Sequence, residues 1–335
     1  MRVSELGEFG LIDLLAEIAH RTRDDQSPAW QNLLIGIGDD AAAWRGDDSI
    51  QLLTVDSFIQ DEHFSLAITP WHEVGWKALA VNLSDIAAMG GVPRYAVVSL
   101  ALPADTEVQA VKALYQGMTK LAQEFGVAIV GGDISRAPQV ALNITVLGST
   151  SNDNMLTRSS AQPGEQIAIT GTLGAASAGL EMFIGKLTFD DKTSARLKQA
   201  FLHPYPRVTE GRLLLEKGVK TAIDVSDGLV ADLGHICQAS KLGARLDTSS
   251  VPVDPVVRAG FGDRALELAL SGGEDYELLF TASAEVIDKI GKIAKFPVTV
   301  IGNMVADKEH KVTLFDREGN PFKLDQGGWE HFKQK

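Results

Sequence analysis

Short apolar runs that end in glycine or in a carboxylate recur along the whole chain, and they constrain its fold more than any other feature. They occur in "LLIGIGDDAA", "LLTVDSF", "VNLSDIAAMGG", "AIVGGDISR", "TAIDVSDGL" and "LSGGEDYELLF". Apolar runs of strand length that alternate with helical periods indicate a mixed α/β architecture. Because the carboxylates stand where strands and helices end, we expect them to converge on one cleft.

The first half of the chain predicts a mixed α/β domain that ends near residue 150. Periodic apolar residues predict a long helix from Trp71 to Met89, which Gly90 and Gly91 terminate, and a second helix that ends at Gly126. Strands are expected in "LLIGIG", "QLLTVDSF", "RYAVVSLALP", "VAIVGGD" and "VALNITVLGS".

A polar, turn-rich segment, "SNDNMLTRSSAQPGEQ", separates this half from a second one that repeats the same alternation. Strands are predicted in "QIAITGT", "TAIDVS", "YELLFTA" and "FPVTVIGNM", and helices in "GAASAGLEMFIG", "PRVTEGRLLLEKG" and "GLVADLGHICQASKLG". A chain of 335 residues is long for a single core. We therefore expect an α+β (mixed α/β) fold of two domains, residues 1–150 and 151–335.

Composition excludes several classes of protein. The net charge of −13 argues against nucleic acid as a partner, because phosphate contacts need a basic face. No apolar run approaches the roughly 20 residues of a membrane span, and "MRVSELGEFGLIDLLAEIAH" lacks the features of a signal peptide. The one cysteine, Cys237, allows no disulfide framework and is expected in the core. A cytoplasmic enzyme fits best, and any phosphorylated ligand would need divalent cations between itself and this acidic chain.

Each carboxylate has a structural alternative to metal binding. Asp39 and Asp40 would either cap a following alanine-rich helix or use both charges to bind a cation. Asp56 ends an apolar strand with Thr54 on the same side. Asp85 stands late in its helix, where the helix dipole disfavours an anion, so it is either a solvated residue or a metal ligand.

The remaining acidic positions follow the same pattern. Asp133 comes after two glycines that permit close approach to a ligand. Asp224, Ser226 and Asp227 repeat the strand-to-loop pattern, whereas Asp232 is expected on the surface or in packing. Oxygen-only ligation by such a set selects Mg²⁺, Ca²⁺ or Mn²⁺. The chain has no GxxxxGK[ST] loop, GxGxxG, kinase HRD or DFG, or GxSxG, so in phosphoryl transfer the metals would neutralise most of the charge.

Five motifs in this order make a resemblance specific: "GIGDDAA", "KALAVNLSDIAAMGGVP", "GGDISR", "DVSDGLVADLGHI" and "LSGGEDYELLFT". From about residue 5 to about residue 332 the chain resembles the thiamine-monophosphate kinase family, which belongs to the ATP-binding superfamily of aminoimidazole ribonucleotide synthetase. The resemblance implies Mg²⁺-dependent in-line transfer of the γ-phosphoryl of ATP to thiamine monophosphate without a phosphoenzyme. This is the last step of thiamine diphosphate synthesis. It also implies a homodimer whose N-terminal domains form a shared β-barrel.

The resemblance also implies roles for individual residues. The implied magnesium ligands are Asp40, Thr54, Val55, Asp56, Asp85, Asp133, Asp224 and Asp227, and the six aspartates among them form the catalytic set. The implied contacts to ATP are Gly132, Asp133, Arg158, Ser226 and Tyr115, with Arg158 on the phosphates. The implied thiamine phosphate site is lined by His63, Glu274 and Trp329.

Several of these roles keep alternatives when the residues are considered alone. His63 fits a surface loop, Glu274 a loop carboxylate, Trp329 a core anchor and Tyr115 a packing position of a helix. Within the superfamily, aminoimidazole ribonucleotide synthetase, selenophosphate synthetase and hydrogenase-maturation proteins are rivals. However, the chain has neither an N-terminal reactive cysteine nor a cysteine-bearing tail. A non-catalytic sensor of nucleotide and Mg²⁺ is the alternative from another class.

Overall fold

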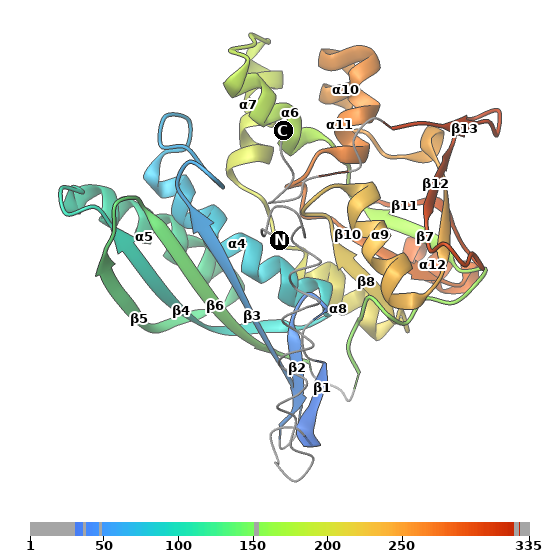
Figure 1. Cartoon of the computed structure of the whole chain (residues 1–335), viewed down its shortest axis with the longest axis horizontal. Helices are drawn as coiled ribbons and strands as arrows, with labels where there is room; N and C mark the ends of the chain where they lie inside the picture. Colours follow the sequence, from blue (N-terminus) through green and yellow to red (C-terminus); the bar gives the residue numbers. More distant parts are fainter. Residues whose placement is uncertain (1–30, 36–37, 47–48, 151–153, 325–327, 329–335) are drawn as a thin grey trace, which may run out of the picture.

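The computed structural model describes residues 31–35, 38–46, 49–150, 154–324 and 328. The described residues up to 150 form a six-stranded sheet in the order β1-β2-β3-β6-β4-β5, and among these strands only β4 and β5 pair in parallel. The strands are β1 (Leu33–Ile35), β2 (Ala42–Arg45), β3 (Ile50–Ile59), β4 (Val92–Leu102), β5 (Ala128–Arg136) and β6 (Ala141–Ser149). Helices α4 (Trp71–Ala88) and α5 (Val108–Phe125) lie on one side of this sheet (Figure 1).

In the part of the chain described after residue 153, a second sheet of seven strands has the order β13-β12-β9-β11-β7-β10-β8, and of these strands only β9 and β12 pair in parallel. Its strands are β7 (Gln166–Thr170), β8 (Thr221–Asp224), β9 (Gly243–Asp247), β10 (Leu278–Ala282), β11 (Val298–Val305), β12 (Val312–Phe315) and β13 (Pro321–Phe322). Its helices are α6 (Ala175–Ile184), α7 (Asp191–Leu202), α8 (Val208–Glu216), α9 (Leu229–Ser240), α10 (Pro255–Phe261), α11 (Ala265–Ser271) and α12 (Ala284–Ile293). The chain is thus a two-domain protein of mixed α/β class.

Helix α4 is the element that joins the two sheets. It contacts β3, β4 and β6 on one side and β8, α7 and α8 on the other, and Figure 1 shows it in the middle of the molecule. This position explains why almost every residue of α4 is buried, including the polar Lys77, Asn82 and Ser84. A helix that is apolar on all faces belongs in a protein interior. The polar side chains that α4 carries into this interior need hydrogen-bonding or ionic partners, and these partners define the candidate active site.

Two glycines allow α4 and α5 to cross at very short distance. A Cβ atom added at Gly75 would come within 1.8 Å of the Leu114 carbonyl oxygen, and one added at Gly117 would come within 1.8 Å of that of His72.

We expect Gly75→Ala to lower the free energy of unfolding by about 3 kcal/mol, because the helices would have to separate. Gly234→Ala on α9 is the control, since its added methyl meets nothing within 4 Å. It should raise stability by up to about 1 kcal/mol in the same denaturant titration. Equal effects of the two variants would contradict this view of the crossing.

The face of the N-terminal sheet opposite α4 and α5 carries exposed apolar side chains. Leu53 and Val55 on β3 are 37% and 60% exposed, and Tyr95 and Val97 on β4 are 51% and 41% exposed. Leu147 of β6 pairs with both Leu53 and Tyr95, so these residues lie in neighbouring rows of one face. Within the described residues the sheet is open and forms no closed barrel.

Most predicted elements are confirmed, and one alternative is wrong. The helix predicted from Trp71 to Met89 is α4, and the one ending at Gly126 is α5, whose C-cap is Gly126 in a left-handed conformation. The alanine-rich stretch after Asp40 is not a helix that Asp39 or Asp40 could cap. It forms β2, because Ala42, Ala43 and Trp44 pair with β3. Cys237 is fully buried in the C-terminal core, as expected. No helix in the described ranges is both long and apolar enough to cross a bilayer.

Candidate active site

Carboxylates from four separate elements meet where the two sheets face α4. Asp40 precedes β2, Asp56 lies on β3, Asp85 is in the last turn of α4, and Asp224 ends β8. Carboxylate oxygens of Asp40, Asp85 and Asp224 all lie within 4.8 Å of one another. Burial raises the pKa of Asp56, the neighbouring Asp85 lowers it, and repulsion from Asp40 raises it again. The sequence prediction that these four residues converge is therefore consistent with the structure.

Hydroxyl and amide side chains hold the carboxylates in this arrangement. The Thr54 hydroxyl donates to Asp85 Oδ2 at 2.5 Å, and the Ser84 hydroxyl donates to Asp224 Oδ2 at 2.6 Å. Asn82 Oδ1 accepts from the backbone N–H of Asp56 at 3.1 Å. The "NLSD" motif of α4 thus contacts two acidic residues, Asp56 through Asn82 and Asp224 through Ser84, although sequence reasoning assigned a role only to its aspartate.

The cluster is electrostatically unfavourable without a cation. Burial, followed by repulsion from Asp56, Asp224 and Asp40, raises the pKa of Asp85 well above its usual value. Burial and Asp40 raise the pKa of Asp224 to about 8, and the same two causes raise that of Asp39 to about 7. Buried like charges at this separation are relieved by proton uptake or by a cation. The oxygen-only donors fit a hard divalent ion such as Mg²⁺.

Arg158 is the cation that the chain itself supplies. Its guanidinium forms a forked contact with Asp40, with Nη2 at 2.6 Å from Oδ1 and Nε at 3.1 Å from Oδ2. Its backbone N–H donates to Asp39 Oδ2 at 3.1 Å. Burial lowers the pKa of Arg158, but the carboxylates of Asp40 and Asp39 raise it by more than burial lowers it. The side chain therefore stays charged. The structure brings Arg158 into the carboxylate cluster, where it neutralises only part of the charge.

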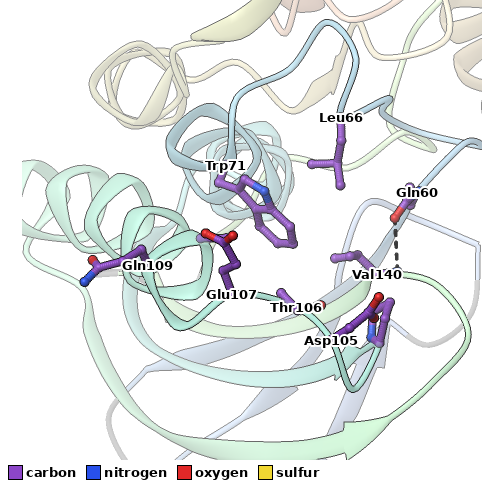
Figure 2. Close-up of a pocket in the computed structure, with 10 residues that line it drawn as sticks. Gln60, Leu66, Trp71, Asp105, Thr106, Glu107, Gln109 and Val140 are labelled. Atoms are coloured by element: carbon purple, nitrogen blue, oxygen red, sulfur yellow. Dashed lines mark hydrogen bonds between the residues drawn. The ribbon is translucent and has the colours of Figure 1, made fainter.

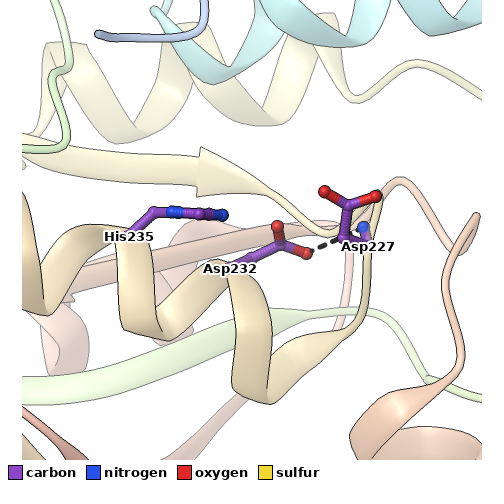
Figure 3. A group of neighbouring side chains, drawn as sticks. All are labelled: Asp227, Asp232 and His235. Atoms are coloured by element: carbon purple, nitrogen blue, oxygen red, sulfur yellow. Dashed lines mark hydrogen bonds between the residues drawn. The ribbon is translucent and has the colours of Figure 1, made fainter. Parts of the chain in front are cut away.

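The loop after β8 is organised by Asp232, a residue expected on the surface or in packing. Asp232 is 1% exposed, and its Oδ2 accepts the backbone N–H groups of Ser226, Asp227 and Gly228, each at 3.1 Å. Figure 3 shows Asp232 beside Asp227 and His235, and one ligand atom from each of the three lies within 4.8 Å of the others. Burial lowers the pKa of His235 to about 4, so its ring is neutral at pH 7. The surface interpretation of Asp232 is wrong.

Replacing Asp232 with alanine should leave three backbone N–H groups without their acceptor and displace Ser226 and Asp227. We expect a loss of about 3 kcal/mol or more in the free energy of unfolding, measured by denaturant titration. Asp232→Asn should recover part of it, because the amide oxygen can still accept. The control is Asp190→Ala, which removes an exposed helix cap that accepts from Lys192 and Thr193 and should cost less. A loss in Asp232→Ala no larger than in the control would contradict the role given to Asp232.

Other predicted site residues lie outside the carboxylate cluster that a single copy of the chain forms. Asp133 and Gly132 are exposed on the edge strand β5, and the row Asp133–Ser99–Asn143–Ser57 places Asp133 three strands from β3, about 14 Å away. Tyr115 packs against the N-terminal core. The side chain of Val55 lies on the exposed face of the sheet. Any contact of Val55 with the cluster would therefore have to come from its backbone. Trp329 lies outside the described residues.

Of the predicted contacts to thiamine phosphate, the structure describes His63 and Glu274, and Glu274 lies against α4. His63 follows β3, and its Nδ1 accepts the backbone N–H of Ile59 at 3.1 Å. Glu274 has a left-handed backbone with φ of 69°, and its carboxylate pairs with Lys77 Nζ at 2.8 Å. Lys77 was missed by sequence reasoning, because a lysine in a helix gives no sign that it is buried.

A pocket of about 560 Å³ lies apart from these residues. It is lined by Trp71, Leu66, Gln60 and Val140 together with the segment that leads into α5, as Figure 2 shows. None of the predicted site residues within the described ranges lines it. The carboxylate cluster is therefore the better candidate for the chemistry.

Comparison with known proteins first defines the class. Residues 38–150 match the family model of the N-terminal domain of AIR synthase related protein, and residues 162–315 match that of its C-terminal domain. The thiamine-monophosphate kinase of Escherichia coli strain K12 is 37% identical over 332 residues, which cover 97% of this chain and 98% of that protein. The thiamine-monophosphate kinase of Bacillus subtilis strain 168 is 34% identical over 333 residues, which cover 96% and 99%.

A solved structure agrees with these relatives. AaThiL complexed with AMPPCP and TMP is 32% identical, aligns with a TM-score of 0.85 and covers 99% of both chains. The chain therefore belongs to the AIR synthase related family and, within it, to the thiamine-monophosphate kinases.

Proposed function

We propose that this chain transfers the γ-phosphoryl group of ATP to thiamine monophosphate, giving thiamine diphosphate and ADP, as the last step of thiamine diphosphate synthesis in the cytoplasm. One observation carries the proposal: buried carboxylates from both domains converge on α4 in a protein of this family. A relative at 32% identity has been solved with AMPPCP and TMP, which supports ATP and thiamine monophosphate as ligands here.

The residues that would hold several Mg²⁺ ions are Asp40, Thr54, Asp56, Asp85, Asp224 and Asp227, together with the backbone of Val55 and with Asp133. Their oxygen-only chemistry and the raised pKa of Asp85 and Asp224 support a divalent cation. When bound, Mg²⁺ would neutralise charge on the phosphates of both substrates. ATP and thiamine monophosphate bring about six negative charges, which acidic residues alone would repel.

The chain's own residues would bind and orient the substrates. Arg158 would hold the ATP phosphates with its buried guanidinium, and Gly132, Asp133, Ser226 and Tyr115 would contact the rest of the nucleotide. His63, Glu274 and Trp329 would line the thiamine phosphate site. The acceptor is a phosphate oxygen that is already ionised near neutral pH, so the reaction needs no general base. Catalysis would then be in-line positioning and charge stabilisation without a phosphoenzyme.

We further propose that residues 1–150 and 151–335 act as separate domains and that two copies pair through their N-terminal sheets into a shared barrel. The exposed apolar face of the N-terminal sheet supports this pairing, because a large exposed apolar patch usually marks an interaction surface. Its exposed side chains are Leu53, Val55, Tyr95 and Val97. Among the described strands β5 is an edge without a partner on its outer side, and Ile134 on it is 70% exposed. Pairing of this edge with β3 of a second copy would bring Asp133 toward the cluster. Sedimentation of the purified chain at the mass of a monomer, 35.9 kDa, would exclude the pairing.

Product analysis tests the reaction. Purified protein is incubated with ATP, MgCl₂ and either thiamine monophosphate or free thiamine, and the thiamine species and nucleotides are separated by chromatography. We expect thiamine diphosphate and ADP in equal amounts from the monophosphate and no product from free thiamine. Binding of ATP without transfer to either acceptor would instead favour a non-catalytic nucleotide sensor.

A further inference from the structure

Lys77 is a deeply buried charged side chain that the proposed reaction does not use. It lies on α4 and is 1% exposed, in a position where an aliphatic residue would normally pack. Its ammonium group lies 2.8 Å from Glu274 Oε1 and 4.1 Å from the centre of the Phe201 ring on α7. A buried ion pair of this kind generally contributes little net stability, so stability alone does not account for it.

The Glu274 side of this pair is held in a strained and closely packed loop. Glu274 and Tyr276, neither of them glycine, both have left-handed backbones, with φ of 69° and 49°. Strained backbone that the surrounding structure holds in place is typical of ligand-binding sites. The backbone N–H of Glu274 donates to the Ser226 carbonyl at 2.8 Å, and a Cβ added at Gly273 would come within 2.3 Å of that same oxygen. The loop is thus fixed to the segment that holds Ser226 and Asp227.

The pair also spans the two domains. Lys77 belongs to the helix that carries Asp85, eight residues and about 12 Å further along the axis, whereas Glu274 and Phe201 belong to the C-terminal half. The Glu274 side chain remains 28% exposed, while that of Lys77 is 2% exposed. The lysine is therefore hidden behind the glutamate, and only the carboxylate is accessible to a ligand.

We propose that Lys77 is a positioning residue. It holds the Glu274 carboxylate in the cleft, where this carboxylate is the hydrogen-bond acceptor for the thiamine part of the substrate. The inference rests on the proposed function and adds to it a residue that acts through Glu274. Because the pair as a whole is uncharged, Glu274 is presented as an oriented hydrogen-bond acceptor rather than as a free anion. The ammonium also fixes this loop against α4, and hence at a set distance from Asp85.

Kinetics of Lys77→Met test the role, since methionine keeps the length of the side chain and removes its charge. We expect the KM for thiamine monophosphate to rise about 10- to 100-fold, as for loss of one charge-assisted contact, and the KM for ATP to change less than about 2-fold. Lys77→Arg should recover part of the loss. The matched control is Lys120→Met on α5, where an exposed ammonium lies 5.6 Å from the centre of the Trp76 ring. It should leave both KM values unchanged.

A double variant keeps the test decisive if Lys77→Met fails to fold. Lys77→Met with Glu274→Gln leaves no unpaired charge, and it should fold and show the same KM for thiamine monophosphate as Glu274→Gln alone. An unchanged KM for thiamine monophosphate in Lys77→Met, or an equal rise in both KM values, would overturn the positioning role. If the wild-type protein does not phosphorylate thiamine monophosphate, the proposed function fails and the role of Lys77 fails with it.

Discussion

Asp85→Asn is expected to lower the rate of phosphoryl transfer by about 10³-fold and, at the same time, to make the metal-free protein more stable. Asp85 is the centre of the cluster, where burial and three neighbouring carboxylates raise its pKa well above the usual value. Asparagine keeps an oxygen that can accept from Thr54 Oγ1 but removes one of the repelling charges. Relief of this repulsion should raise Tm in the presence of a chelator by about 5 °C.

Initial rates with saturating ATP and MgCl₂ measure the first effect, and calorimetry in EDTA measures the second. Asp288→Asn is the control, because Asp288 is an exposed aspartate of α12 far from the cluster in the fold, and it should change neither quantity. A less stable metal-free Asp85→Asn protein would show that Asp85 is a structural residue. Retention of the full rate in Asp85→Asn would show that Asp85 is not a required metal ligand.

The metal-free protein is expected to lose stability as pH rises from about 4 to 8, and Mg²⁺ is expected to restore it at the upper end. In the unfolded chain an aspartate ionises near 3.8, whereas burial and Asp40 raise the pKa of Asp224 to about 8 and that of Asp39 to about 7 in the folded state. Between these values the folded state binds more protons than the unfolded state, so rising pH favours unfolding. Each such group contributes a slope of about 1.4 kcal/mol per pH unit.

Calorimetry at pH 5, 6, 7 and 8, in EDTA and in MgCl₂, measures this dependence. The two Tm curves should separate as pH rises, because cation binding replaces the protons that the cluster releases. Asp224→Asn should flatten the curve in EDTA, while the exposed Asp288→Asn should leave it unchanged. A Tm in EDTA that stays constant or increases over this range would contradict the electrostatic account of the cluster.

Local sequence signals were sufficient where a residue's role depends on its own element. The period of apolar residues and the glycine stops predicted α4 and α5, and the placement of Asp85 and Asp224 near the ends of elements indicated that they converge. Asp56 was expected to end its strand, but it lies within β3, which continues to Ile59 because its later residues pair with β6. The alternative of a helix after Asp40 failed because alanine favours helices intrinsically, whereas pairing with β3 made the stretch a strand.

The remaining features depended on contacts between distant segments. Asp232 resembles any acidic residue in the first turn of a helix, and only the folded loop brings three N–H groups to it. Lys77 looks like a surface lysine until α7 and the Glu274 loop cover it. Asp133 follows a glycine pair that suggested the same site, but the strand order of the sheet separates β5 from β3.

The number of divalent cations bound at equilibrium shows directly whether the converging carboxylates hold metal ions for the phosphates. Mn²⁺ is titrated into the protein with and without a non-hydrolysable ATP analogue, and free Mn²⁺ is measured by its electron paramagnetic resonance signal. We predict more than one tightly bound Mn²⁺ per chain with the analogue, and a loss of at least one of them in Asp85→Asn but not in Asp288→Asn. If the analogue instead binds equally tightly in EDTA and the wild-type protein retains no Mn²⁺, the carboxylates do not hold metal ions for the phosphates.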